Sequence, residues 1–171
     1  MQIFTIGHST RSIDDFRKIL STFRITALID VRSFPRSFKN PQFNKDVIGL
    51  ELSKDQIQYI WLEKLGGRRK GLGNSSRNTC WKNKSFRNYA DYVETSKFRE
   101  GIEQLLQLGQ SGTIALMCAE SLYWRCHRSM IADFLLSKGI EVTHIFDVKH
   151  VQQHRYTGCA RIVDGELTYH E

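Results

Sequence analysis

The chain has 171 residues and a formal charge of +7, from 25 Lys and Arg against 18 Asp and Glu, with a sequence pI near 9.4. Apolar residues make up 40% of it and 12 residues are glycine, which excludes a disordered polymer and a fibrous repeat. The longest strongly apolar stretch, Ile114 to Ala119, is far shorter than the roughly 20 residues that cross a bilayer. We therefore expect one globular domain over residues 1–171, without a membrane span.

The amino terminus has neither a basic leader nor a small-residue cleavage site, so we expect a cytoplasmic protein rather than a secreted one. Its four cysteines are Cys80, Cys118, Cys126 and Cys159, and none of them form a CxxC pair. Without a secretory context, such cysteines are expected to be reduced thiols.

The first third of the chain alternates apolar runs with amphipathic stretches. A strand is predicted over Ile3 to Ile6, broken at Gly7. Ser12 and Asp15 resemble a capping box, and apolar residues from Ile13 to Phe23 then fall on one helical face. Ala27 to Val31 is predicted as the second strand because it is short and rich in β-branched residues.

A loop follows, since Pro35 and Pro41 discourage a regular element between Ser33 and Phe43. Val47 and Leu50 indicate a short helix, and Ile57 to Leu62 indicates a third strand.

The second half repeats the alternation of helices and strands. A helical stripe from Phe98 to Leu106 is predicted to end in a left-handed cap at Gly109, and Thr113 to Cys118 reads as a buried central strand. A further helix from Ile131 to Leu135 should stop at Lys138-Gly139, before a fifth strand over Glu141 to Phe146.

Near the carboxyl terminus, Asp164-Gly165 between two β-prone runs indicates a hairpin, with a frayed edge as the alternative. Together the elements predict a single three-layer α/β domain with a mainly parallel sheet of about five strands flanked by helices.

The predicted strand ends carry reactive side chains. In chain order these ends are Gly7-His8-Ser9-Thr10, Asp30-Val31-Arg32-Ser33, Leu65-Gly66-Gly67-Arg68 and Cys118-Ala119-Glu120, and the next helix begins near Cys126-His127-Arg128. Parallel strands place their carboxyl ends at one edge, where open α/β sheets bind ligands. Imidazole, carboxylate, thiol and guanidinium groups are therefore expected around one pocket, which suits acid–base or nucleophilic chemistry on an anionic substrate.

Each of these residues also has a purely structural interpretation. His8 can be a hydrogen-bonded core imidazole, Asp30 can simply orient Arg32, and Cys118 suits inert packing at the end of a strand. The case of Cys126 is stronger, because a helix amino terminus and the neighbouring cations would lower the pKa of its thiol.

Four blocks of sequence resemble the domain-of-unknown-function 488 family: Thr5 to Thr10, Asp30 to Ser37, Leu65 to Arg68, and Cys118-Ala-Glu with Cys126-His-Arg. The resemblance implies a compact α/β domain and no settled activity. The positions that carry the family motif are His8, Asp30, Arg32, Arg36, Gly67, Cys118, Glu120, Cys126, His127 and Arg128.

Two segments concentrate the positive charge. Eight basic residues and no acid lie between Lys64 and Arg87, and Arg32 to Lys45 interleaves basic residues with three phenylalanines. Guanidinium groups can bind phosphate in a fork and aromatic rings can stack on bases, which favours a nucleotide or nucleic acid as partner. The alternative is a solvated, solubilising surface.

Three mechanisms remain open. In the first, Glu120 or Asp30 acts as acid or base, assisted by His8 or His127, in hydrolysis or group transfer on a phosphate-bearing substrate. In the second, Cys126 or Cys118 is a nucleophile, although the spacing of the known thiol phosphatases and sulfurtransferases, five residues between Cys and Arg, is absent. In the third, Cys118, Cys126 and His127 bind zinc, with or without His8 as a fourth ligand; this is an alternative to the expectation of no cofactor.

A binding module without catalysis is the competing hypothesis. The candidate substrate-binding residues are Ser9, Arg32, Ser33, Arg36, Gly67, Arg68 and Arg128, and the candidate nucleic-acid contacts are Arg69, Lys70, Arg77, Lys82 and Lys84.

Overall fold

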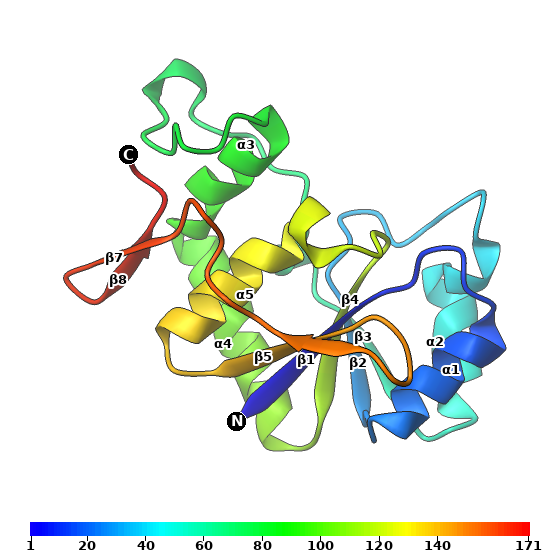
Figure 1. The fold of residues 1–171 in the computed structure, drawn as a ribbon. Helices are drawn as coiled ribbons and strands as arrows, with labels where there is room; N and C mark the ends of the chain where they lie inside the picture. The colour runs from blue at the N-terminus through cyan, green and yellow to red at the C-terminus, as the bar shows by residue number, and fades with distance from the viewer.

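A computed structural model describes all residues from 1 to 171. Its central sheet has six strands in the order β3-β2-β4-β1-β5-β6 (Figure 1), and only the β5–β6 pair is antiparallel. The strands are β1 (Gln2–Gly7), β2 (Ala27–Asp30), β3 (Gln58–Trp61), β4 (Ile114–Cys118), β5 (Glu141–Ile145) and β6 (Val151–Gln153).

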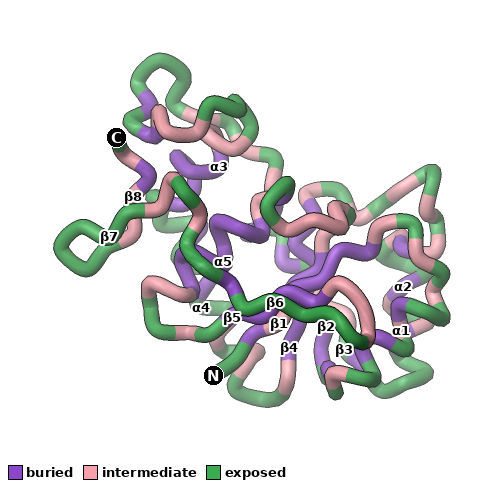
Figure 2. The backbone as a smooth tube through the Cα atoms, in the orientation of Figure 1, coloured by how far each residue is buried: buried purple, intermediate pink, exposed green.

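Five helices cover the two faces of the sheet, which confirms the predicted three-layer α/β architecture. One face carries α1 (Ile13–Thr22) and α2 (Lys45–Ser53), and the other carries α3 (Lys84–Val93), α4 (Ser96–Gln110) and α5 (Arg128–Ser137). Each face has its own apolar core, and the buried backbone runs through the inner strands and α5 (Figure 2).

The predicted carboxyl-terminal hairpin is confirmed as β7 (Arg161–Val163) and β8 (Glu166–Thr168), a two-stranded sheet separate from the central one. Asp164 and Gly165 form its turn at φ values of 52° and 80°. This left-handed pair is the reason that Asp-Gly predicts tight hairpins.

The residues that predict where helices begin or end are correct for α1 and α5 and wrong for α4. The Ser12 hydroxyl accepts the Asp15 backbone N–H at 3.1 Å, and Gly139 follows α5 with φ at 76°. The cap predicted at Gly109 is wrong, because α4 continues through this residue to Gln110 and closes at Ser111 in a right-handed conformation. Packing of α4 on the sheet outweighs the modest cost of a glycine within a helix.

Two elements were not predicted from the sequence. Helix α3 begins within the basic segment, and its charged residues make the helical pattern hard to recognise in the sequence. Its apolar face, with Tyr89, Ala90 and Val93, is buried. Strand β6 is exposed at all three residues and therefore has no apolar alternation.

The expectation of four reduced thiols is wrong for one pair. Cys80 and Cys159 form a disulfide between the loop before α3 and the segment before β7, while Cys118 and Cys126 are free. The bonded residues are 79 positions apart, so only the fold brings them together. None of the helices combines the length and apolar character that crossing a bilayer requires.

The chain order creates a crevice beside β1. The connection that leaves β1 passes to α1 on one face of the sheet, whereas the connection that leaves the adjacent strand β4 passes to α5 on the other face. Such a switch point is where open α/β sheets bind ligands. Gly7 keeps the two connections close, because a Cβ there would lie 2.0 Å from the Glu120 carbonyl oxygen.

Candidate thiol site in an arginine-lined cavity

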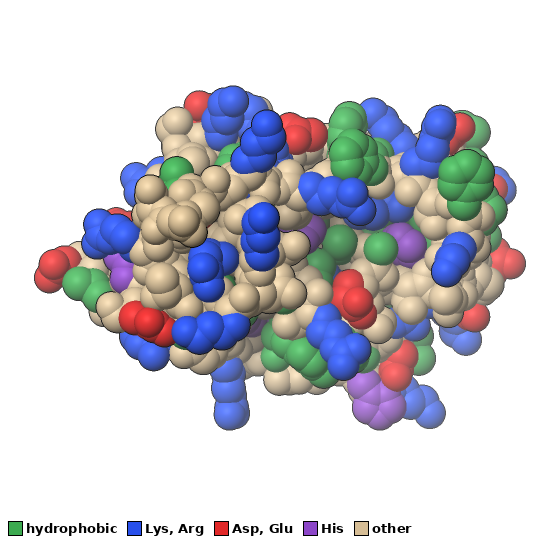
Figure 3. Space-filling model, turned by 90° about the horizontal axis from the view of Figure 1, so that it is seen from above, with side chains coloured by type: hydrophobic (Ala, Val, Ile, Leu, Met, Phe, Trp, Pro, Cys, Tyr) green, Lys and Arg blue, Asp and Glu red, His purple; other side chains and the backbone are tan.

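A cavity of about 780 Å³ opens at this switch point, at the carboxyl ends of β1, β2 and β4. Figure 3 views the same edge: Lys and Arg side chains surround a hollow in which histidine side chains are visible, and few acidic groups lie near it. Eleven predicted site residues line the cavity, namely His8, Ser9, Arg32, Ser33, Arg36, Gly67, Arg68, Cys118, Glu120, Cys126 and His127.

Seven other candidates lie outside the cavity lining: Asp30, Arg128, Arg69, Lys70, Arg77, Lys82 and Lys84. Asp30 and Arg128 are buried behind it. Arg69 pairs with Glu63 and covers the ring of Tyr92, while Lys82 bonds the side chain of Glu171. The basic segment therefore uses part of its charge within the fold.

One wall of the cavity is formed by His8 and Arg32, with Asp30 buried behind them; these three residues are here termed the arginine wall. The Asp30 carboxylate is fully buried, and it accepts Arg32 Nε and Nη2 as well as the Tyr59 hydroxyl, the last at 2.6 Å. Burial by itself would lower the pKa of Arg32, but hydrogen bonds and charge from Asp30 raise it. Asp30 thus holds a permanently charged guanidinium at the cavity.

His8 uses both of its ring nitrogens within this wall. Its Nδ1 lies 2.8 Å from the Ser9 carbonyl oxygen and its Nε2 lies 3.3 Å from Arg32 Nη1. Since the carbonyl needs a donor and the guanidinium an acceptor, the proton belongs on Nδ1. Burial, with the nearby charge of Arg32, lowers the pKa of His8 to about 4 although the Ser9 bond opposes this. The ring stays neutral and orients Arg32.

The opposite wall is formed by Cys118, Cys126 and His127, here termed the thiol wall. His127 Nε2 lies 2.9 Å from the Val31 carbonyl oxygen, and its Nδ1 lies 3.5 Å from Cys126 Sγ. The carbonyl again requires the proton on Nε2, so the lone pair of Nδ1 faces the thiol. This is the arrangement in which an imidazole can take a thiol proton.

A glycine makes room for this imidazole. A Cβ on Gly67 would lie 2.5 Å from His127 Nδ1, closer than side chains can pack. The Gly66-Gly67 pair that the sequence places after β3 therefore has a steric role in the thiol wall.

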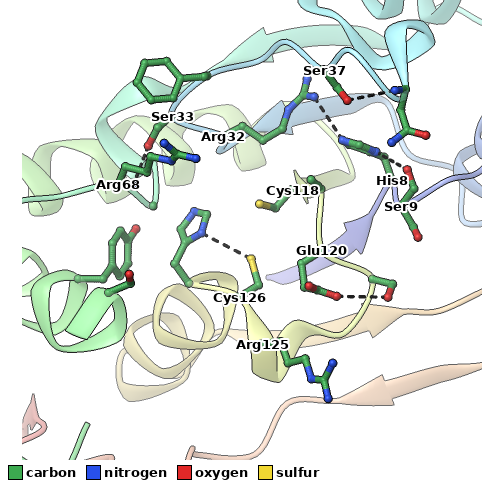
Figure 4. Close-up of a pocket in the computed structure, with 18 of the residues that line it drawn as sticks. His8, Ser9, Arg32, Ser33, Ser37, Arg68, Cys118, Glu120, Arg125 and Cys126 are labelled. Carbon is green, nitrogen blue, oxygen red and sulfur yellow. Dashed lines mark hydrogen bonds between the residues drawn. The ribbon is translucent and has the colours of Figure 1, made fainter. Parts of the chain in front are cut away.

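The two thiols share one region of the cavity. The Sγ atoms of Cys118 and Cys126 and a ring nitrogen of His127 all lie within 4.8 Å of one another, and both sulfur atoms point into the same space in Figure 4. Burial opposes ionisation of Cys126, but its hydrogen bond with Cys118, the positive charge of His127 once the ring has taken the thiol proton, and the charge of Arg128 hold the Cys126 pKa well below the usual thiol range. The same bond, and then burial, raise the pKa of Cys118.

Arg128 supplies positive charge from behind the thiol wall. Its side chain is 1% exposed, and its guanidinium donates to the Thr5 hydroxyl and to the Glu120 carbonyl oxygen. It thereby connects β1 to the loop that follows β4, and it lies too deep to contact a ligand in the cavity.

Glu120 lies at the cavity between the two walls (Figure 4). Its Oε1 accepts the Leu122 backbone N–H at 3.3 Å and the Ser121 hydroxyl at 3.4 Å, so one carboxylate oxygen shapes the loop after β4. Its other oxygen has no hydrogen bond and is available to a ligand.

Cys118, Cys126 and His127 are also the group whose atoms could together hold a metal ion. Two sulfur atoms and one imidazole nitrogen suit zinc and would leave one position open. Arg128, whose positive charge lies behind the sulfur atoms, can also compensate the negative charge of a Cys126 thiolate, and this arrangement does not require a metal ion.

Several lining residues are not among the predicted site residues, although Thr10 and Ala119 belong to the predicted strand ends. They are Thr10, Phe34, Ser37, Asn40, Asn83, Ser85, Phe86, Tyr89, Ala119, Ser121 and Arg125. Those from Asn83 to Tyr89 belong to the start of α3, and the spacing of Phe86, Tyr89, Ala90 and Val93 in the sequence is the signal that would have located that helix.

Fold and cavity together define a class: an α/β domain with a thiol–imidazole pair facing arginines at the carboxyl edge of a parallel sheet. Within that class the chain belongs to the family described as "Domain of unknown function DUF488", whose family model matches residues 12–135. The match spans both walls except His8. No curated protein and no solved structure matches this chain.

Proposed function

We propose that this protein is a cysteine-dependent enzyme that transfers a group from a substrate bearing a phosphate-like anion. The observation that carries the proposal is the pairing of Cys126 Sγ with a lone pair of His127, 3.5 Å apart, inside a cavity lined by arginines. A thiolate held beside positive charge is a nucleophile at neutral pH.

The arginines supply the recognition of the anion. Arg36, Arg68 and Arg125 line the cavity, and none of them takes part in an ion pair within the protein. Guanidinium groups without carboxylate partners can bind phosphate-like oxygens in a bidentate fashion. Arg32 contributes a further charge from the arginine wall.

The reaction follows from these positions. His127 Nδ1 takes the Cys126 proton, and the thiolate attacks the bound electrophilic atom; a bond from Sγ to that atom forms while the bond to the leaving group breaks. The leaving group takes the proton that the His127 imidazolium carries. We favour this route over hydrolysis by a pair of carboxylates, because Asp30 is committed to Arg32 and Tyr59, which leaves Glu120 as the only carboxylate that lines the cavity.

Alkylation with iodoacetamide tests the nucleophile. Cys126 is expected to react at pH 6 at a rate close to its rate at pH 8, whereas an ordinary thiol slows by roughly 100-fold over this range. Cys126→Ser should abolish the fast reaction and Cys118→Ser should retain it in part. Inorganic phosphate should slow it by occupying the cavity. Reaction of Cys126 with the pH dependence of an ordinary thiol would overturn the proposal.

A second candidate function, nucleic-acid binding, is favoured by the loop beside the cavity. Phe38 is fully exposed and Phe34 is 68% exposed, and unpaired Arg36 and Lys39 flank them. Exposed phenyl rings among cations suit a ligand that offers both bases and phosphates. The loop would hold a strand while the cavity takes the reacting group.

Binding of a fluorescent single-stranded oligonucleotide tests this second function. Replacing Arg36, Lys39 and Arg68 with Ala should weaken binding and reduce the slope of log K against log salt by about 0.7 per lost phosphate contact. Lys18→Ala with Arg24→Ala, on α1 and the turn after it, is a control that removes two exposed basic residues outside the cavity, and it should leave the slope unchanged. If the two sets of substitutions reduced the slope equally, the oligonucleotide would be held only by nonspecific attraction to the positive charge of the protein.

A further inference from the structure

The second free thiol is not explained by a single nucleophile. Cys118 ends β4 at the cavity wall, with its Sγ within 4.8 Å of Cys126 Sγ. Transfer of a phosphoryl group requires one sulfur atom, and a neighbouring thiol adds nothing to it. In sulfur chemistry, by contrast, a second thiol can attack the first and release what it carries.

Cys118 and Cys126 are the two cysteines that remain as thiols. The only other cysteines, Cys80 and Cys159, are bonded to each other between the loop before α3 and the segment before β7. Cys118 and Cys126 are therefore the only free thiols, and they face one cavity.

We propose that the group transferred is sulfur: Cys126 takes a sulfane sulfur atom from an anionic donor, and Cys118 releases that atom as sulfide. This inference rests on the proposed function and names its substrate class. A sulfane sulfur donor such as thiosulfate is a small dianion, and its leaving group, sulfite, is an anion that the cavity arginines can bind.

The first step forms a persulfide. The Cys126 thiolate attacks the outer sulfur of thiosulfate, a new S–S bond forms, and the S–S bond to the sulfonate breaks with its electron pair leaving as sulfite. The product is Cys126–S–S⁻. No oxidant is consumed, because the sulfur atom moves with its oxidation level unchanged.

The second step uses Cys118. Its sulfur attacks Cys126 Sγ, a Cys118–Cys126 disulfide forms, and the outer sulfur leaves with the electron pair and the Cys118 proton as HS⁻. The two thiols are oxidised and the sulfane sulfur is reduced, so electrons balance. A low-molecular-weight thiol such as glutathione then restores both cysteines by two exchanges, becoming a disulfide itself.

Single-turnover measurements on the full-length protein, freed of reductant and kept in chelator, test this sequence. With thiosulfate, the unaltered protein should release one equivalent of sulfite and then one of sulfide, and peptide mapping should find a Cys118–Cys126 disulfide. Cys118→Ser should release sulfite but retain a persulfide that cyanide removes. Cys126→Ser should release neither.

Inorganic polysulfide provides a second route to the persulfide that does not depend on recognition of thiosulfate. The persulfide of the unaltered protein should decay at least 10-fold faster than that of Cys118→Ser. Equal lifetimes, or sulfide release without the mapped disulfide, would overturn the role of Cys118. In that case fast, pH-insensitive alkylation of Cys126 would still support the thiol nucleophile, so the two proposals fail separately.

Discussion

Each wall of the cavity contains a histidine, His8 just after β1 and His127 at the start of α5, and their hydrogen bonds give the two rings opposite properties. His8 in the arginine wall has a partner on each ring nitrogen, Ser9 and Arg32. His127 in the thiol wall has one nitrogen fixed on Val31 and the other turned to Cys126. In the arginine wall both nitrogens of His8 are already hydrogen-bonded, so this wall serves to present the charge of Arg32. In the thiol wall His127 keeps a lone pair that can accept a proton from Cys126.

The largest effect should come from breaking the ion pair of the arginine wall. Asp30→Asn leaves the Arg32 guanidinium buried without its carboxylate, and we expect the free energy of unfolding to fall by about 3–5 kcal/mol. Urea unfolding measures this loss. The matched control is Asp55→Asn, which breaks an exposed pair with Arg17 and should cost about 1 kcal/mol or less. Equal losses would mean that Asp30 does not support a buried charge.

The second prediction compares the two histidines directly. His127→Asn removes the base that faces Cys126, so alkylation of this thiol by uncharged iodoacetamide at pH 7 should slow by about 10- to 100-fold. His8→Asn should change that rate by less than about threefold, because His8 has no lone pair free for a thiol. If His8→Asn slowed alkylation as strongly as His127→Asn, the assignment of roles to the two walls would be wrong.

The third prediction concerns acid stability, where the effect of one histidine over one pH unit is the smallest of the three. Burial lowers the pKa of His8 to about 4 and that of His144 to about 2, so both rings stay largely neutral in the folded protein from pH 6.5 down to roughly pH 5. The unfolded chain binds a proton at each below pH 6.5. The free energy of unfolding should therefore decrease as the pH is lowered, by about 1.4 kcal/mol per pH unit for each ring.

His8→Asn isolates the contribution of the arginine wall to this slope. Urea unfolding at pH 6.5, 5.5 and 4.5 should show a shallower decline for the variant, by one histidine's contribution. An unchanged slope would show that His8 takes up a proton equally in the folded and unfolded states.

Most of the fold could be predicted from the sequence because its signals are local. Alternating apolar runs located five strands, Ser12 located the start of α1, and Asp164-Gly165 located the hairpin. The failures came where the signal is weak or not local. Helix α3 was missed because its charged residues obscure the apolar periodicity in the sequence. The helix end predicted at Gly109 was wrong because the packing of α4 keeps this residue helical.

The sequence alone determined which chemistry is present at the sheet edge, because strand ends in an α/β fold are fixed by local patterns of apolar and polar residues. Only the tertiary structure decided how each group is used. It committed Asp30 to Arg32, buried Arg128 behind the cavity, bonded Cys80 to Cys159 and left Cys118, Cys126 and His127 together. The reason is that a hydrogen bond or a disulfide depends on distances between residues far apart in the chain, and those distances are set only when the layers pack.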